Sequence, residues 1–176
     1  MEGEHRDAIS AGRDAFLAGD WAGARDAFAR ALPSGEPRAL DGYGQALWFL
    51  GEPEAGIEWR ERACIAHAER GECDAAGRIA AWVAHQHVIA GRGSLARGWL
   101  ARGERALATR EDCAGAGWVA VERARLAPLA ERLEGTARAL AIARRAGDAD
   151  LECFALSILG RSEVEAGRFD DGIAHL

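Results

Sequence analysis

The sequence contains no lysine and no asparagine, and only four of its 176 residues are proline. All 22 basic residues are therefore arginines, and 28 acidic residues give a formal net charge of −6. The arginines are interleaved with Asp and Glu, so no basic stripe is available to neutralise the phosphates of a nucleic acid. We therefore expect no direct nucleic-acid contact from this chain.

Long apolar runs are also missing. No segment approaches the roughly 18 to 20 apolar residues that a membrane-spanning helix needs. The N-terminal residues Met1 to Arg6 lack the basic-then-apolar pattern of a signal peptide. We expect a cytoplasmic protein with no membrane contact.

The four cysteines lack the close pairs found in zinc ribbons and redox motifs. Cys64, Cys73, Cys113 and Cys153 follow one another at spacings of 9, 40 and 40 residues. Each lies among alanines and larger apolar residues at helical spacing. We expect all four to be small, buried apolar side chains.

Two histidine arrangements suggest metal ligands. His85 and His87 are two residues apart, so on a helix they point about 200° apart and cannot ligate the same ion. Cys64 and His67 are three apart and form the start of a two-ligand site, but zinc requires at least one more protein ligand and none is suggested. We therefore expect no metal and no cofactor, with packing or a solvated imidazole as the simpler role of these side chains.

Catalytic motifs are weak. The segment Gly91–Ser94 precedes a helix and has the composition to hold an anion, but it lacks the strand and the lysine of a phosphate loop. We favour a helix start capped by Ser94. Three acid pairs fall at predicted helix starts, where they complement the helix dipole. We favour this structural role over that of paired catalytic carboxylates. The pairs are Glu52/Glu54, Glu111/Asp112 and Asp170/Asp171. We expect a non-enzymatic protein.

Helical periodicity dominates the chain, and a hairpin recurs along it. The first copy runs from Ala8 to Leu32 and turns at Gly19-Asp20-Trp21. Similar turns follow at Gly51, Gly91 and Gly167. A unit that repeats every 30 to 45 residues or so cannot bury its apolar face alone, so stacked copies are expected to form an all-α solenoid.

We predict ten helices in five hairpins. The helix over 128–146 is predicted to continue through Gly135, because its apolar residues keep their helical spacing across that glycine. Only half of the last hairpin's apolar face is present, so we expect a single repeat domain over 1–176 that is truncated within its last repeat. The predicted helices cover 4–18, 21–32, 37–50, 53–70, 73–90, 94–108, 112–126, 128–146, 148–166 and 169–176, and the repeats cover 4–32, 37–70, 73–108, 112–146 and 148–176.

Small and aromatic residues at fixed helix contacts give these hairpins a family likeness. They are Gly12, Trp21, Ala24, Phe28 and Ala31 in the first copy, Leu40, Tyr43, Gly44, Leu47, Gly56 and Ala63 in the second, and Leu156, Leu159, Gly160, Phe169 and Gly172 in the last. In this pattern the chain resembles tetratricopeptide repeats. The resemblance implies a right-handed superhelical α-solenoid of about five antiparallel helix hairpins. Three positions depart from it: Arg60 replaces an aromatic residue, Gln86 stands where glycine is expected, and Pro128 occupies a turn.

Several longer phrases are similar to the repeat region of large bacterial LuxR-type transcription regulators, especially actinobacterial ones. They are Trp82–Ala84, Arg97–Leu100, Ala146–Glu152 and Ala166–Gly172. In that family the repeats sense a ligand or partner, and a C-terminal helix-turn-helix binds DNA. The resemblance implies the sensor or scaffold part of such a regulator, with the DNA-binding domain outside this chain.

In the register that the resemblance implies, the first helix of each hairpin lines a groove. That register places seven residues there: Arg38, Asp41, Gln45, Trp48, His87, Phe154 and Arg161. Arginine, aromatic and amide groups suit the recognition of a protein or peptide, and a small-molecule effector is the alternative ligand. The other five tryptophans, Trp21, Trp59, Trp82, Trp99 and Trp118, are expected in the core.

Two other functions stay open. A stand-alone scaffold, unrelated to transcription, would use the repeats to assemble a complex or to form a homodimer. An enzyme with an all-helical pocket would show turnover that depends on a polar residue of the groove.

Overall fold

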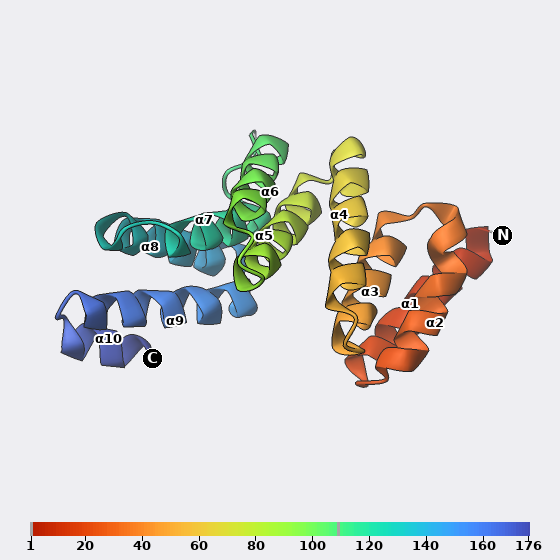
Figure 1. The fold of residues 1–176 in the computed structure, drawn as a ribbon, viewed down its shortest axis with the longest axis horizontal. Helices are drawn as coiled ribbons and strands as arrows, with labels where there is room; N and C mark the ends of the chain where they lie inside the picture. The colour runs from red at the N-terminus through yellow and green to blue at the C-terminus, as the bar shows by residue number, and fades with distance from the viewer. Residues whose placement is uncertain (1, 109) are drawn as a thin grey trace. The chain divides into compact units, whose positions relative to one another are not determined.

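The computed structural model describes residues 2–108 and 110–176, and over these ranges the chain is all-helical, as predicted. Residues 1 and 109 of the predicted domain lie outside these ranges. Each predicted helix boundary lies within two residues of the observed one, and the helix through Gly135 is continuous. The helices are α1 (Glu2–Leu17), α2 (Trp21–Ala31), η1 (Leu32–Ser34, a 3-10 turn), α3 (Pro37–Phe49), α4 (Pro53–Glu69), α5 (Cys73–Ile89), α6 (Gly93–Ala106), α7 (Ala114–Arg125), α8 (Leu129–Ala146), α9 (Ala149–Glu165) and α10 (Phe169–His175) (Figure 1).

The tight turns form where glycine allows a left-handed backbone. The four glycines predicted at turns, Gly19, Gly51, Gly91 and Gly167, have φ values of 72–84°. After α1, the Gly19 amide donates to the Phe16 carbonyl at 3.1 Å and the Asp20 amide to the Ala15 carbonyl at 2.9 Å. This Schellman-type closure satisfies the last carbonyls of the helix and allows the chain to reverse.

The start of α6 differs from the prediction. The helix begins at Gly93, and its N-cap residue, Arg92, makes no side-chain capping hydrogen bond. Ser94 already lies inside the first turn, where its Oγ accepts a hydrogen bond of 3.3 Å from Arg97. The prediction that Ser94 caps this helix is therefore wrong.

The chain divides into two compact units, one up to Glu72 and one from Cys73 onward. In the first unit, α2 packs on α1 and α3, and α3 packs on α4. Ala24, Phe28 and Ala46 form a buried cluster there. The ring of Phe28 fills the space beside Gly12, where an added Cβ would lie 2.9 Å from the ring.

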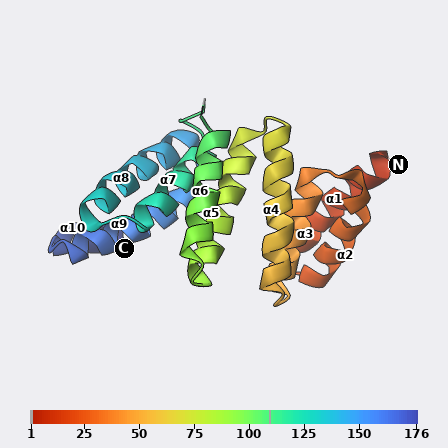
Figure 2. The ribbon, with the colours of Figure 1, turned by 45° about the horizontal axis from the view of Figure 1, so that its top comes forward.

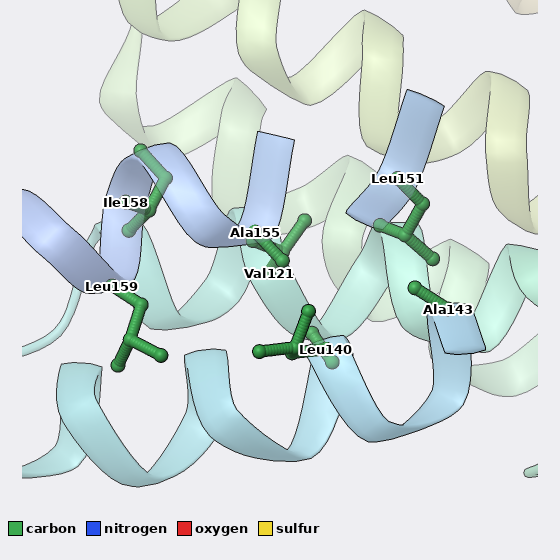
Figure 3. Close-up of a cluster of buried hydrophobic side chains, with 8 residues drawn as sticks. Val121, Leu140, Ala143, Leu151, Ala155, Ile158 and Leu159 are labelled. Atoms are coloured by element: carbon green, nitrogen blue, oxygen red, sulfur yellow. The ribbon is translucent and has the colours of Figure 1, made fainter. Parts of the chain in front are cut away.

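In the second unit, α7 packs mainly on α5 and α8, α8 also packs on α9, and α10 packs on α9. Figures 1 and 2 both show α8 beside α7 and α9. Apolar side chains from these three helices point toward one another and form a buried cluster (Figure 3). It includes Val121, Leu140, Ala143, Leu151, Ala155, Ile158 and Leu159.

Pairs of glycines bring the two helices of a hairpin into close contact. A Cβ on Gly44 would lie 2.8 Å from the Gly56 carbonyl oxygen, and a Cβ on Gly56 would lie 2.8 Å from that of Gly44. Gly160 and Gly172 repeat this arrangement between α9 and α10, at 2.7 Å in each direction. Both pairs are twelve residues apart in the sequence. The close backbone approach explains why glycine occupies these positions.

The cysteines are less uniformly buried than predicted. Cys64 is buried, Cys73 and Cys113 are half-buried, and Cys153 is exposed. Cys153 lies about 160° around α9 from the buried Ala155, on the opposite side of the helix. The prediction is confirmed for Cys64 and wrong for Cys153.

All six tryptophans are half-buried, so the predicted core set lies at the edges of the core. Trp21 stacks on Phe49 with ring centroids 4.3 Å apart. Arg62 lies over Trp59 at 4.7 Å, and Arg102 lies over Trp99 at 5.1 Å. The indole is too large to be fully enclosed in helical layers rich in alanine, and its outer edge is covered instead by a guanidinium group or another ring.

Candidate partner-binding face

The predicted groove residues of the first unit all lie on α3, and two of them belong to a polar network. The carboxylate of Asp41 accepts hydrogen bonds from Gln45 Nε2 at 2.6 Å and from Arg60 Nε of α4 at 2.7 Å. Arg60 is only 8 % exposed, so its guanidinium group is held in place beneath Asp41. Trp48 is half-buried and Arg38 is exposed.

In the second unit, Phe154 and Arg161 are seven residues apart on α9 and therefore share one side of that helix. His87 of α5 is only 4 % exposed. It lies on the same side of α5 as the buried Ala80, Val83 and Ala84. His87 therefore offers almost no surface to a partner, whereas the side chain of His85 is 27 % exposed.

The repeat register predicted for α5 differs by two residues from the one in the structure, and this difference explains why the buried His87 was predicted in the groove. The register that put Gln86 at the glycine position also put His87 in the groove. In the structure, Ala84 and Ala96 belong to one buried cluster and are twelve residues apart, like Gly44 and Gly56. Ala84 is therefore the small contact residue of the α5–α6 hairpin, and the exposed positions shift from His87 to His85.

With this register, equivalent positions on α5, α7 and α9 carry aromatic and cationic side chains. The small contact residues of these helices are Ala84, Ala124 and Gly160. Ala124 is identified by its close contact with α8, because a Cβ on Gly135 would lie 2.8 Å from it. Three side chains precede these contact residues by six positions and three follow them by one. We call these six residues the α5–α7–α9 face: Arg78, Trp118 and Phe154, followed by His85, Arg125 and Arg161.

Asp148 joins three helices at one end of this face. Its Oδ2 accepts hydrogen bonds from Arg78 at 2.6 Å and from Trp118 Nε1 at 3.1 Å. Its Oδ1 accepts from the Leu151 amide at 3.0 Å and so caps α9. Burial alone would raise the pKa of Asp148, but the Leu151 and Trp118 hydrogen bonds and the Arg78 charge together hold it below its usual value. The ionised carboxylate thus fixes α5, α7 and α9 together.

Aromatic rings form the middle of the face. Trp118 and Phe154 stack with centroids 5.6 Å apart and an interplanar angle of 28°. The ring of His85 meets Phe154 edge-on at 6.1 Å. All three rings are half-buried, so part of each remains accessible to solvent.

A buried ion pair holds two of the residues that follow the contact residues by one position, His85 and Arg125. The carboxylate of Glu122 is 4 % exposed and accepts from Arg125 Nε at 3.0 Å and Nη2 at 2.8 Å. Its other oxygen lies 2.7 Å from His85 Nδ1. Both carboxylate oxygens are therefore occupied, as a buried carboxylate requires, and His85 and Arg125 are held in one orientation. Arg161 is exposed and has no ion-pair partner among the residues that the structure describes.

The arrangement suits recognition, because it presents an aromatic surface and a guanidinium group held by internal hydrogen bonds. In the part of the chain that the structure describes, no three His, Cys, Asp or Glu side chains are grouped to hold a metal ion. Of the pair considered above, Cys64 is buried and His67 Nδ1 lies 2.5 Å from a carboxylate oxygen of Glu72.

No family model and no curated protein sequence matches this chain. Among solved structures it is similar to the crystal structure of BtubC (BKLC) from P. vanneervenii, with a TM-score of 0.62 and 18 % sequence identity. The similarity covers 99 % of this chain and 87 % of that one, and at this identity it concerns the fold alone. None of the helices in the described ranges combines the length and apolar character required to cross a membrane.

Proposed function

We propose that this chain is a non-catalytic binding module and that the α5–α7–α9 face takes a peptide or a helix of a partner protein. The observation that carries the proposal is the joined aromatic and cationic surface built from equivalent positions of three helices. Trp118 and Phe154 provide an apolar platform, and Arg161 provides an exposed positive charge. The matching ligand has an apolar anchor residue followed by a carboxylate.

Preorganisation supports this function. Arg78, Trp118, His85 and Arg125 are each fixed by a hydrogen bond to Asp148 or Glu122. Side chains that are already ordered lose little conformational entropy when a partner binds. Aromatic and arginine residues also contribute most of the affinity at many protein interfaces.

The wider architecture in this proposal is a right-handed, tetratricopeptide-like solenoid of five hairpins. It forms the sensor or scaffold part of a bacterial transcription regulator that acts in the cytoplasm. The recurring glycine contacts and the fold-level similarity to BtubC support the repeat architecture, and the phrases similar to LuxR-type repeat regions support the regulator. A downstream reading frame without a helix-turn-helix would contradict the regulator.

The second candidate is a stand-alone scaffold that assembles with copies of itself. The observation that favours it is the exposed apolar side of α10, where Phe169 is 60 % exposed and Ile173 67 %, together with Leu176 directly after the helix, which is 69 % exposed. Light scattering separates the two functions: a mass that rises with concentration and returns to the monomer in Ile173→Glu favours the scaffold. A monomer at all concentrations contradicts it.

A peptide selection tests the leading proposal directly. The purified chain is used to select binders from a phage-displayed library of random dodecapeptides. We expect the selected peptides to combine an aromatic or leucine residue with Asp or Glu. Selected peptides without acidic residues, or peptides that bind the Phe154→Leu variant equally well, would contradict this site.

A further inference from the structure

A concave site separate from the α5–α7–α9 face lies in the second unit, between α6 and α8, with α7 as its base. Its volume is about 520 Å³, and residues of all three helices line it. Pockets of about 300–1,000 Å³ are the size that small organic ligands occupy. Nothing in the proposed peptide-binding function uses this pocket.

Apolar side chains form the inner wall of this pocket. Leu107, Val119, Ala124 and Ile142 line it, and each is at most 5 % exposed. Gly135 of α8 also lines it, and its lack of a side chain allows α8 to approach Ala124 of α7 closely. Such a wall suits a ligand with an apolar body.

The rim of the pocket has an excess of negative charge. Four of the lining residues are glutamates and two are arginines. Glu104 pairs with Arg123, and Glu111 pairs with Arg138 at 3.5 Å. The two remaining carboxylates, Glu131 and Glu134, have no ion-pair partner among residues 2–108 and 110–176. They are three residues apart on α8, so they lie on the same side of that helix.

We propose that this pocket binds a small organic cation, an amine or guanidine with an apolar body of aromatic or aliphatic character. The apolar body contacts the half-buried Ala116, Ala120 and Gly135 above the inner wall, and the cationic group lies between Glu131 and Glu134. Two carboxylates without cationic partners select against anions and give a cation an advantage over a neutral ligand of the same shape.

The pocket and the α5–α7–α9 face use opposite sides of α7. The pocket-lining Ala116, Ala120 and Arg123 lie roughly half a turn around the helix from Trp118 and Arg125. A ligand in the pocket therefore leaves the peptide-binding face free.

Three probes with one carbon skeleton and different charges test this proposal: phenylbutylamine, phenylbutanol and phenylbutyrate. Binding to the intact chain is measured by titration calorimetry at low salt. We expect phenylbutylamine to bind about fivefold more tightly than phenylbutanol, given the modest strength of two partly solvated ion pairs, and phenylbutyrate to bind most weakly. Equal affinities for the three probes, or no binding of the amine, would overturn the proposal.

Two variants locate the binding site. In Glu131→Gln/Glu134→Gln the advantage of the amine over the alcohol is expected to disappear, and in Ala120→Leu the added side chain is expected to weaken all three probes. The matched control is Glu58→Gln/Glu69→Gln on α4, which removes two exposed carboxylates outside the pocket and is expected to leave the amine's advantage unchanged.

An advantage of the amine that survives in Glu131→Gln/Glu134→Gln overturns the proposal even if Ala120→Leu fails to fold. Displacement of the amine by a peptide selected for the α5–α7–α9 face would also overturn it, since the two ligands would then share a site.

Discussion

Among individual residues, Asp148 holds a central position because one carboxylate serves three helices. It caps α9 and accepts hydrogen bonds from Arg78 of α5 and Trp118 of α7. Its side chain is only 7 % exposed. A polar side chain that is both buried and fully hydrogen-bonded stabilises one arrangement of the helices around it.

The lowered pKa of Asp148 predicts how stability depends on pH. Because its pKa is lower in the folded chain than in the unfolded chain, the ionised group adds stability above its unfolded pKa. That contribution is lost as the pH falls below about 4, toward the folded pKa. We expect Asp148→Asn to be destabilised relative to the wild type at about pH 7, with a smaller difference at about pH 3. Urea unfolding of both proteins at the two pH values measures this, and a difference that does not change with pH would contradict the role of the charge.

For the helices and hairpins, the sequence predicted the helix bounds equally well throughout the chain, but it identified the contact residues between helices better at the two ends than in the middle. The first, second and last hairpins carry glycine or a large aromatic residue at their contacts, and these residues identify the register. In α5 the contact side contains Ala76, Ala80 and Ala84, all nearly inaccessible. Several alanines of equal size do not single out one contact position. A repeated separation of twelve residues between small side chains is the signal that identifies Ala84.

The glycine contact within a hairpin gives a prediction with an internal control. A methyl group at Gly44 would meet the Gly56 carbonyl at 2.8 Å, whereas one at Gly98 of α6 would have no atom within 4 Å. We expect Gly44→Ala to lose about 1–3 kcal/mol of unfolding free energy through overpacking. We expect Gly98→Ala to gain about 0.5–1 kcal/mol, because alanine has less conformational freedom to lose in a helix. Chemical denaturation of both variants tests this, and the same sign of change in both would contradict the close approach of α3 and α4.

For the molecule as a whole, the all-helical class could be predicted from periodicity, and the predicted groove overlaps the proposed α5–α7–α9 face only in part. Phe154 and Arg161 belong to both sets, because the last hairpin retains its glycines. Arg78, Trp118 and Arg125 of the proposed face were not among the predicted groove residues, which included the buried His87 and not His85. Trp118 was expected in the core because indoles are mostly apolar, yet its Nε1 donates to Asp148 and its ring stacks on Phe154. These two contacts join residues 30 and 36 positions apart in the sequence, so no local pattern indicates them.

The location of all six face residues in one unit leads to a prediction about a shorter chain. Residues 73–176 contain the complete α5–α7–α9 face. We expect this segment, produced alone, to bind a selected peptide within about twofold of the affinity of the whole chain, since every contact that supplies the affinity is retained. Fluorescence anisotropy of a labelled peptide provides the measurement. A large loss of affinity in a segment with unchanged helix content would contradict the placement of the site in the second unit.

In the proposed function a partner contacts Arg161 together with Trp118 and Phe154. The dissociation constant of one selected acidic peptide tests this for three proteins: the wild type, Arg161→Glu and Arg97→Glu. Both arginines are exposed on helices of the second unit, so the two variants change the net charge equally. We predict that Arg161→Glu weakens binding by about tenfold or more, as loss of a dominant interface residue does, and that Arg97→Glu changes it by less than about twofold. An equal effect of the two charge reversals would mean that the peptide responds only to the net charge of the chain. Unchanged binding by Arg161→Glu would contradict a contact between the peptide and Arg161.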